Sequence, residues 1–487
     1  MNCWTALSLA AVILTASRCD REKDTLRIEP VRYEDGTIVT GDVQADSLFV
    51  QDRFLTDTTF TDKGDTLFII RHTSAYLRLE LTGLQANTPI ERIDLIPTYG
   101  EFKGMGSLFR AFPGTRTPDD GPLVVWAAFA SQDFSGSSFA VVVHGTGGTR
   151  WTALLPGISF ESGTAYSRTV SCLDATAPDP GLTATPLPQT LTGTDSGEYS
   201  GITWLSGDSY AAVSDNLKGG GVVLFTIPIE SDGSVGEVKA RIPEGTAQAG
   251  GKSRDPEGIA CIPGRNRLYI SSEKHQDIRE YDLEGHETGA GLRIPGDFSA
   301  SAITANKGFE ALTFNEETGL FWTTTEAPLK RDTFLPRLHR LQSFGRDGAP
   351  GKRYFYETDT PAKSPAEAAH AQAYVFGIPA MTALDDGRLI VLEREVYVPK
   401  GGLLDKFLDS FTRTSLYLVD PARDEAGILR KSLLCTFSTN SVDLANYEGM
   451  CLGPTLPDGR RCLLLISDSQ NGGGGLTQEY VKVVLLR

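Results

Sequence analysis

The sequence lacks an excess of positive charge and the motifs of several common enzyme classes. It has 46 Lys and Arg residues against 62 Asp and Glu, which gives a formal net charge of −16 at pH 7. This charge argues against nucleic acid and anionic lipid as partners, because both are themselves negative. The sequence contains no His-Glu-x-x-His and no Gly-x-Ser-x-Gly. It therefore predicts neither a zinc metalloprotease nor a serine hydrolase with a nucleophile elbow.

Cysteine is also scarce. Five cysteines follow the first 19 residues: Cys172, Cys261, Cys435, Cys451 and Cys462. An odd number with no Cys-x-x-Cys pair argues against a disulfide framework and a structural zinc site. Cys451 and Cys462 fall on the two strands of one expected hairpin and are able to pair, but buried free thiols are the favoured interpretation.

The N-terminus has no hydrophobic run long enough to cross a bilayer, which takes about 20 apolar residues. The apolar run at residues 4–16 instead indicates an export signal over residues 1–19, although a basic start is missing. Cys19, with an acidic stretch just after it, resembles the lipidated cysteine of Bacteroides-type surface lipoproteins, while Arg18 departs from the small residue usual there. We therefore expect an exported protein, either secreted, periplasmic or held at the cell surface by a lipid on Cys19.

The first half of the chain shows strand patterns and no helical stretch of useful length. Residues 75–81 alternate apolar and polar side chains, which is the period of a half-buried antiparallel strand. Residues 20–176 are expected to form an all-β sandwich of about seven to nine strands. Its closing run, residues 163–170, resembles the last strand of fimbrillin-like sandwiches. A Pro-rich connector at residues 177–188 then marks the domain boundary.

The second half repeats one unit five times. Its clearest copy, residues 306–326, has two short β-type runs about a polar turn that contains Gly, which is typical of a β-hairpin. A small residue recurs in the first strand, with spacings of 57, 53, 69 and 69 residues, at Gly201, Gly258, Ala311, Ala380 and Gly449. Recurring β units of this size predict a propeller or a solenoid.

Each hairpin is followed by further strands, and four strands per repeat make a propeller blade. The last repeat has one strand after its hairpin, so we expect the segment before Tyr199 to supply the missing outer strand and close the ring. The predicted fold is all-β: an N-terminal sandwich followed by a β-propeller of five or six blades over residues 189–487. Residues 364–373 are the one helix-prone insertion, with Ser364 as cap and Pro365 first.

Acidic residues recur at both ends of the hairpin. Three repeats open with an acid: Glu257, Glu310 and Glu448. All five close with one: Asp215, Glu273, Glu326, Glu393 and Asp468. The start of one antiparallel strand lies beside the end of its partner, so these carboxylates are expected at one rim of the ring. Crowded like charges repel unless cations lie among them, and Ca²⁺ takes six to eight oxygen ligands. A Ca²⁺ site is therefore predicted there; the alternative is that the acids pair with backbone amides and basic side chains to hold the blades together.

These motifs resemble the phytase-like domain family named for "esterase-like activity of phytase". The matching segments are residues 255–260 with Glu273, residues 306–312 with 325–329, residues 392–394, residues 448–460 and residues 467–468. The resemblance covers roughly residues 189–487. It implies a β-propeller, hydrolysis of an ester or phosphoester and, through the more distant β-propeller phytases, Ca²⁺. Ser469 stands where Asn is expected after the last Ser-Asp pair, which puts a ligand role there in doubt.

The favoured hypothesis is an exported, metal-dependent hydrolase of a small anionic ester or phosphoester, acting as a monomer. Its predicted metal ligands are Glu257, Glu310, Glu448, Asp215 and Asp468. Its predicted catalytic residues are Glu310, Glu273 and Glu326, and Arg254, Lys307 and Arg394 are expected to bind the substrate. Two alternatives stay open, a non-catalytic binding or scaffold lipoprotein and a lactonase-type propeller, because no nucleophile is evident in the sequence.

Overall fold

The structure is a computed structural model. It describes residues 25–28, 32–35, 54–60, 66–72, 74–103, 109–111, 117, 121–175, 177–194, 197–214, 221–246, 254–332, 335–424, 427–440, 443–469 and 478–487. Two compact units, Met1–Ala175 and Thr176–Arg487, divide the chain. The expected export signal, Cys19 and Asp215 lie outside the described residues. Across those that are described, no helix has the length and apolar character that a membrane crossing needs.

The first unit is built from small sheets. One sheet has the order β1-β4-β3, with bounds Thr25–Ile28, Thr66–His72 and Phe54–Phe60. A second has the order β2-β13-β5-β8, with bounds Arg32–Tyr33, Thr164–Ser171, Ser74–Thr82 and Leu123–Ala130. A third has the order β14-β11-β10-β6-β7, with bounds Leu173–Asp174, Arg150–Pro156, Ser138–Gly145, Ile90–Pro97 and Phe109–Ala111. A short pair joins β12 (Ser159–Phe160) to β9 (Gln132–Asp133), and a 3₁₀ turn, η1, covers Thr146–Gly148.

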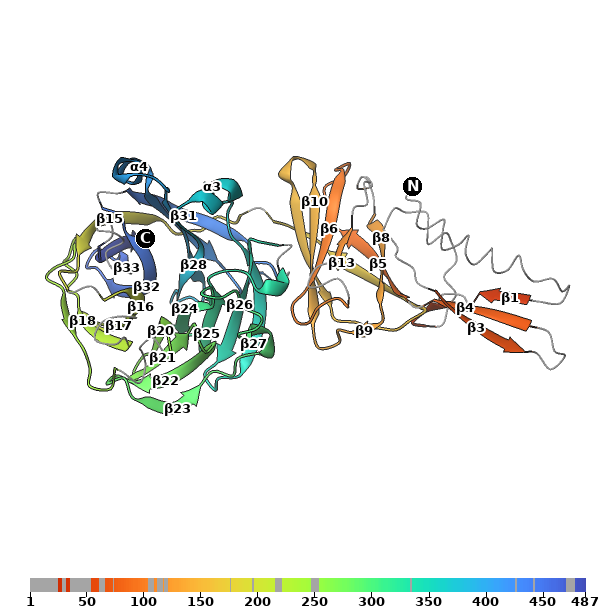
Figure 1. Ribbon diagram of the computed structural model, residues 1–487, viewed down its shortest axis with the longest axis horizontal. Coiled ribbons are helices and arrows are strands. Elements are labelled where there is room, and N and C mark those ends of the chain that lie inside the picture. The colour runs from red at the N-terminus through yellow and green to blue at the C-terminus, as the bar shows by residue number, and fades with distance from the viewer. Residues whose placement is uncertain are drawn as a thin grey trace. The chain divides into compact units, whose positions relative to one another are not determined.

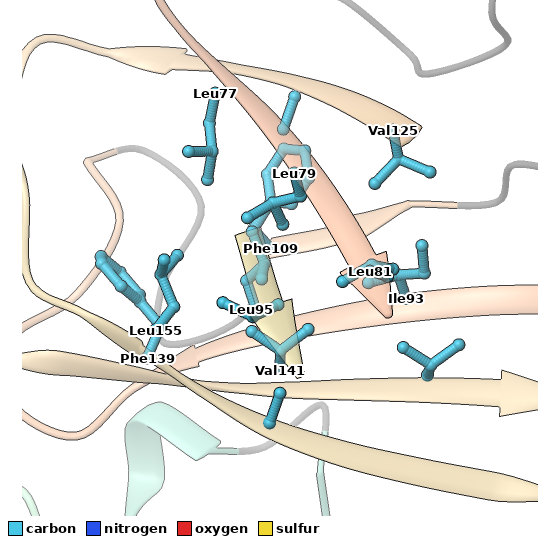
Figure 2. Close-up of a cluster of buried hydrophobic side chains, with 14 of the residues drawn as sticks. Leu77, Leu79, Leu81, Ile93, Leu95, Phe109, Val125, Phe139, Val141 and Leu155 are labelled. Atoms are coloured by element: carbon cyan, nitrogen blue, oxygen red, sulfur yellow. The ribbon is translucent and has the colours of Figure 1, made fainter. Parts of the chain in front are cut away.

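The second and third of these sheets share one apolar core (Figure 2). The predicted face of β5 is buried, because Leu77, Leu79 and Leu81 are each no more than 2% exposed. They belong to the same cluster as Leu95 of β6 and Val141 of β10. One expectation was wrong: β5 pairs antiparallel with β8 but parallel with β13. Alternation along a strand fixes which face is buried and does not fix the direction of its neighbours. The likeness to fimbrillin-like sandwiches stays a prediction.

In the part of the chain that the structure describes, the second unit has five four-stranded sheets. They are arranged around a ring (Figure 1). The first blade is β16 to β19, Tyr199–Ser206, Ser209–Ser214, Gly221–Thr226 and Lys239–Arg241. The second is β20 to β23, Pro256–Ile262, Arg267–Ser272, Asp277–Asp282 and Glu287–Gly291. The third is β24 to β27, Phe309–Asn315, Leu320–Thr325, Leu338–Gly345 and Pro350–Glu357. The fourth is β28 to β31, Ala373–Ala383, Leu389–Val398, Phe411–Val419 and Lys431–Asn440. The fifth is β32 to β34, Asn446–Thr455, Arg461–Asp468 and Tyr480–Leu486, joined by β15, Ala184–Leu191.

Strand β15 closes the ring, as the sequence predicts. It pairs antiparallel with β34, the last strand of the chain, from Ala184 opposite Leu486 to Leu191 opposite Tyr480. The first strand of the propeller therefore completes the blade made by the last three, which leaves the ring without an open seam. The end of the expected connector, residues 184–188, belongs to this strand.

The inner strands of neighbouring blades approach closely, which explains the recurring small residues. Each inner strand contacts that of the next blade, in the order β16, β20, β24, β28, β32 and back to β16 (Figure 1). A Cβ atom on Gly201 would meet the carbonyl oxygen of Glu257, and one on Gly258 would meet that of Glu310. Backbone contact between blades therefore requires Gly at positions 201 and 258.

Short helices lie in the loops between strands of the propeller. Helix α3, Pro365–His370, begins with a capping box between Ser364 and Glu367, as predicted, and ends earlier than expected. Helix α4, Leu403–Asp409, follows β29 and was not predicted from the sequence. Two 3₁₀ turns, η3 and η4, cover Gly296–Phe298 and Lys330–Asp332. The five cysteines from Cys172 onward are free thiols. The expected burial holds for Cys172, Cys451 and Cys462, whereas Cys261 and Cys435 are half-buried.

Candidate functional site at the acidic mouth

A β-bulge interrupts each inner strand of the propeller, and in three blades the opening acid lies within it. The pairing of inner strand with second strand shifts register between Pro256 and Ile259, between Phe309 and Ala311, and at the matching positions of the other blades. Glu257 and Glu310 fall inside these bulges. A bulge adds a residue to one strand and turns its side chain out of the alternating pattern. The hairpin pattern of the sequence predicts where the acids lie along the strands. It does not predict the bulge that changes the direction of their side chains.

The closing position lies across from the residue two positions before the opening acid. The amide of Glu273 donates to the carbonyl of Asp255, and the amide of Glu326 donates to that of Gly308, each at 2.9 Å. Asp468 pairs with Asn446 in the same way. Three predicted closing acids therefore occupy equivalent places in blades two, three and five.

The fourth blade departs from the prediction. Its register places Arg394 opposite Gly377, so Arg394 and not Glu393 takes the closing position. Successive side chains of a strand point to opposite faces, and Glu393 therefore points away from the mouth. There it accepts hydrogen bonds from Tyr356 at 2.6 Å and from the amide of Asp359 at 2.9 Å. The expectation that Glu393 joins the acidic rim was wrong.

Arg394 bridges three blades at the centre of the mouth. Its side chain is 2% exposed and pairs with the carboxylates of Glu326 and Glu448. It also donates to Asn446 Oδ1 at 2.9 Å, and Asn446 in turn donates to Glu448 at 2.8 Å. A guanidinium thus offsets part of the crowded negative charge that the sequence places here. Within the described residues, its Nε has no hydrogen-bond partner.

Glu310 is the buried acid of this group. It is 8% exposed, and among the described residues its carboxyl group forms no hydrogen bond or ion pair. Burial raises the pKa of Glu310 well above its usual range. The nearby carboxylates of Glu326, Glu448 and Glu273 raise this pKa further, and Arg394 opposes them. Glu310 therefore tends to hold a proton, which makes it a candidate acid.

Three other carboxylates gather beside it on the second blade. The ligand oxygens of Asp255, Glu257 and Glu273 all lie within 4.8 Å of one another. Burial raises the pKa of Asp255, and Lys274 opposes that shift. Burial likewise raises the pKa of Glu273, against a hydrogen bond of 2.7 Å from the amide of Gly308. Hard cations prefer such oxygen donors, so this donor set fits a divalent cation. Asp255 begins the second repeat in the sequence, but it was not predicted as a ligand, because the prediction covered only the opening and closing acids of each repeat.

The basic residues expected to bind substrate are all paired with acids. Lys307 forms an ion pair with Glu326 at 2.5 Å, and Arg254 forms one with Asp277 at 2.5 Å. Arg394 is paired as described above. The alternative interpretation, in which basic side chains hold the blades together, therefore applies to Arg394, which links separate blades. It applies in part to Glu273, which accepts a hydrogen bond of 2.7 Å from the amide of Gly308 at the start of the third blade.

The centre of the ring is nearly closed below the mouth. A cavity of about 10 Å³ lies between the five inner strands and is lined by Ser200, Glu310 and Glu448 with apolar neighbours. That volume is about the space of one water molecule. Asp468 is 7% exposed, and the Ser469 hydroxyl beyond it donates to Glu479 at 3.1 Å.

Fold and site together define a five-bladed β-propeller protein with a carboxylate-rich mouth. Residues 194–470 match the family described as "Phytase-like: Esterase-like activity of phytase". This match covers more than half of the chain, and the protein belongs to the phytase-like family, which confirms the resemblance seen in its motifs.

Solved structures resemble the chain only loosely. The periplasmic gluconolactonase of Pseudomonas aeruginosa is 16% identical at a TM-score of 0.27, covering 78% of this chain and 93% of that one. Aldose sugar dehydrogenase of Streptomyces coelicolor, bound to PQQ, is 13% identical at 0.35, covering 64% and 100%. Virginiamycin B lyase of Staphylococcus aureus is 11% identical at 0.25, covering 89% and 98%. A search of curated proteins gives no match. Likenesses at this level assign neither a reaction nor a ligand to this chain.

Proposed function

We propose that the acidic mouth is the active site of a metal-assisted ester hydrolase. The observation that carries this proposal is the set of Asp255, Glu257 and Glu273, whose oxygens lie within 4.8 Å of one another beside the buried Glu310. Three carboxylates this close repel one another strongly without a cation among them. The family description, esterase-like activity of phytase, names the same class of reaction.

Asp255, Glu257 and Glu273 would hold the cation, and Ca²⁺ suits a donor set made only of carboxylates. When bound, such an ion polarises an ester oxygen and lowers the pKa of a coordinated water. The protein's own part is to fix the donors: the 2.7 Å hydrogen bond from Gly308 orients Glu273. The side chains of Glu448 and Asp468, also expected to bind metal, lie on the fifth blade, and Glu448 is paired with Arg394.

Glu310 is placed to supply a proton. Its raised pKa keeps the carboxyl group protonated closer to neutral pH than an exposed Glu. In ester hydrolysis a proton passes to the oxygen of the departing alcohol as the ester bond to it breaks. Glu326 acts by position, because its pair with Arg394 holds the third blade against the fourth, while Lys307 pairs with it within the third blade.

The charge of the mouth favours a neutral carboxylic ester or a lactone over a phosphoester. Arg254, Lys307 and Arg394, the three cations expected to hold an anion, are each paired with a carboxylate. A phosphate group would depend on the metal alone for charge compensation. This preference keeps the lactonase-type alternative open within the same proposal.

The test combines metal binding with hydrolysis. Ca²⁺ at about a hundredfold excess over Kd should stabilise the folded protein by about 2.7 kcal/mol and raise the melting temperature, and chelator should reverse this. On a panel of carboxylic esters, lactones and phosphoesters, Glu310→Gln should lose at least about a hundredfold in turnover. Glu280→Gln is the matched control, since Glu280 lies on β22 and bonds to Tyr269 at 2.6 Å. A melting curve indifferent to metal, together with no turnover on any substrate, leaves the binding or scaffold protein as the explanation.

A further inference from the structure

A second pocket opens at the other end of the propeller, where the inner strands end. Its volume is about 260 Å³, and all five inner strands contribute to its lining. The mouth with Glu310 lies at the start of these strands, so the two openings face opposite ends of the ring. They are separated by the cavity of about 10 Å³ described above. An organic ligand cannot pass through a cavity with room for one water molecule. The two openings are therefore separate sites.

The pocket has an apolar floor and aromatic walls. Ile202, Ile259 and Leu312 form its floor, and they also line the small central cavity. Trp204 and Phe314 stand higher on the walls. Wells of this kind, apolar with a few polar groups, are the usual form of small-molecule sites.

Carboxylates outnumber cations in the lining. Glu316, Glu317 and Asp385 face a single guanidinium, that of Arg461. Glu316 is offset by Arg346 at 2.6 Å. Glu317 forms no ion pair or hydrogen bond with the described residues, and Asp385 has only a contact of 3.9 Å with Arg461.

The guanidinium of Arg461 is already engaged within the pocket wall. It lies over the ring of Trp204, 5.1 Å from the centroid, and donates to Thr455 at 3.0 Å. Among the described residues, Glu317 is therefore without a cationic partner, and Asp385 has only its long contact with Arg461, above an apolar well. A ligand with a positive charge and an apolar body would fit this pocket, because its charge would pair with the carboxylates and its body would fill the apolar well.

We propose that this pocket binds a small organic monocation, an amine with an apolar body. The body fills the well above Ile202 and Leu312, and the ammonium group lies between the carboxylates of Glu317 and Asp385. The site is independent of hydrolysis at the acidic mouth and does not rest on that function.

The experiment measures binding of n-hexylammonium to the full chain by ligand-detected NMR, with 1-hexanol and hexanoate as neutral and anionic probes. We expect hexylammonium to bind more tightly than hexanoate. The double variant Glu317→Gln/Asp385→Asn should weaken hexylammonium about five- to tenfold, which is the scale of two exposed charge pairs. Both side chains lie at the surface, so folding is not at risk. Asp386→Asn is the matched control, because Asp386 lies next in the chain and pairs with Arg388.

Three results would overturn the proposal. The first is hexanoate binding as tightly as hexylammonium, and the second is an affinity unchanged in the double variant. The third is loss of hexylammonium binding in Glu310→Gln or on adding Ca²⁺, with no effect of the double variant. That result would mean that hexylammonium binds at the acidic mouth and not in this pocket. A failure to detect hydrolysis at the mouth, by contrast, would not count against binding in this pocket.

Discussion

Arg394 makes the sharpest prediction about how the acidic mouth is held together. Replacing it by Met keeps much of the side-chain length and removes the charge. The side chains of Glu326 and Glu448, which are 3% and 11% exposed, would then lose their shared cation. The hydrogen bond to Asn446 would be lost as well.

The expected cost follows from burial. Removing one partner of a buried ion pair costs about 3–5 kcal/mol, because the remaining charge is left uncompensated. A domain has about 5–15 kcal/mol of stability in total, so Arg394→Met should come close to unfolding the propeller. Arg423→Met is the control, since Arg423 is 81% exposed and pairs with Asp420 at the surface. Its loss should change stability by less than about 1 kcal/mol.

The assay is urea unfolding of both variants at pH 7 and pH 5. Burial raises the pKa of Glu448, and Arg394 opposes that shift. Without Arg394 the folded protein would bind protons that the unfolded chain releases, so stability falls as pH rises. The deficit of Arg394→Met should therefore shrink at pH 5. If Arg394→Met and Arg423→Met cost the same at pH 7, the charge argument for this mouth is wrong.

Two further predictions concern Glu310 and the domain boundary. The raised pKa of Glu310 means that wild-type stability falls as pH rises from the pKa of an unfolded Glu, about 4.3, to the folded pKa. Glu310→Gln removes this pH dependence. The free energy of unfolding of the variant, minus that of wild type, should therefore increase from pH 5 to pH 8. A difference that stays constant over this range contradicts the raised pKa of Glu310. A fragment of residues 177–487 should show near-UV circular dichroism of a packed protein, whereas residues 189–487 should not, because the latter lacks the first five residues of β15. Equal spectra would show that closure by β15 is dispensable.

The repeat and the ring were decided by the sequence. Hairpins with a small residue in a fixed place predict blades, because inner strands approach one another too closely for a larger side chain, as at Gly201 and Gly258. The single strand after the last hairpin predicts that an earlier segment completes the blade, and β15 does so. Local pattern is sufficient here, since alternation and turn residues are properties of adjacent positions.

The composition of the mouth was decided only by the tertiary structure. Sequence spacing treats Glu393 as the fourth closing acid, but the register of β28 with β29 puts Arg394 there instead. Asp255 joins Glu257 and Glu273 although it precedes the hairpin motif. A shift of one residue reverses the face on which a side chain lies, and bulges introduce such shifts without a clear sequence signal. Which acids share a cation, and which share a guanidinium, is therefore a property of strand register and of contacts between blades.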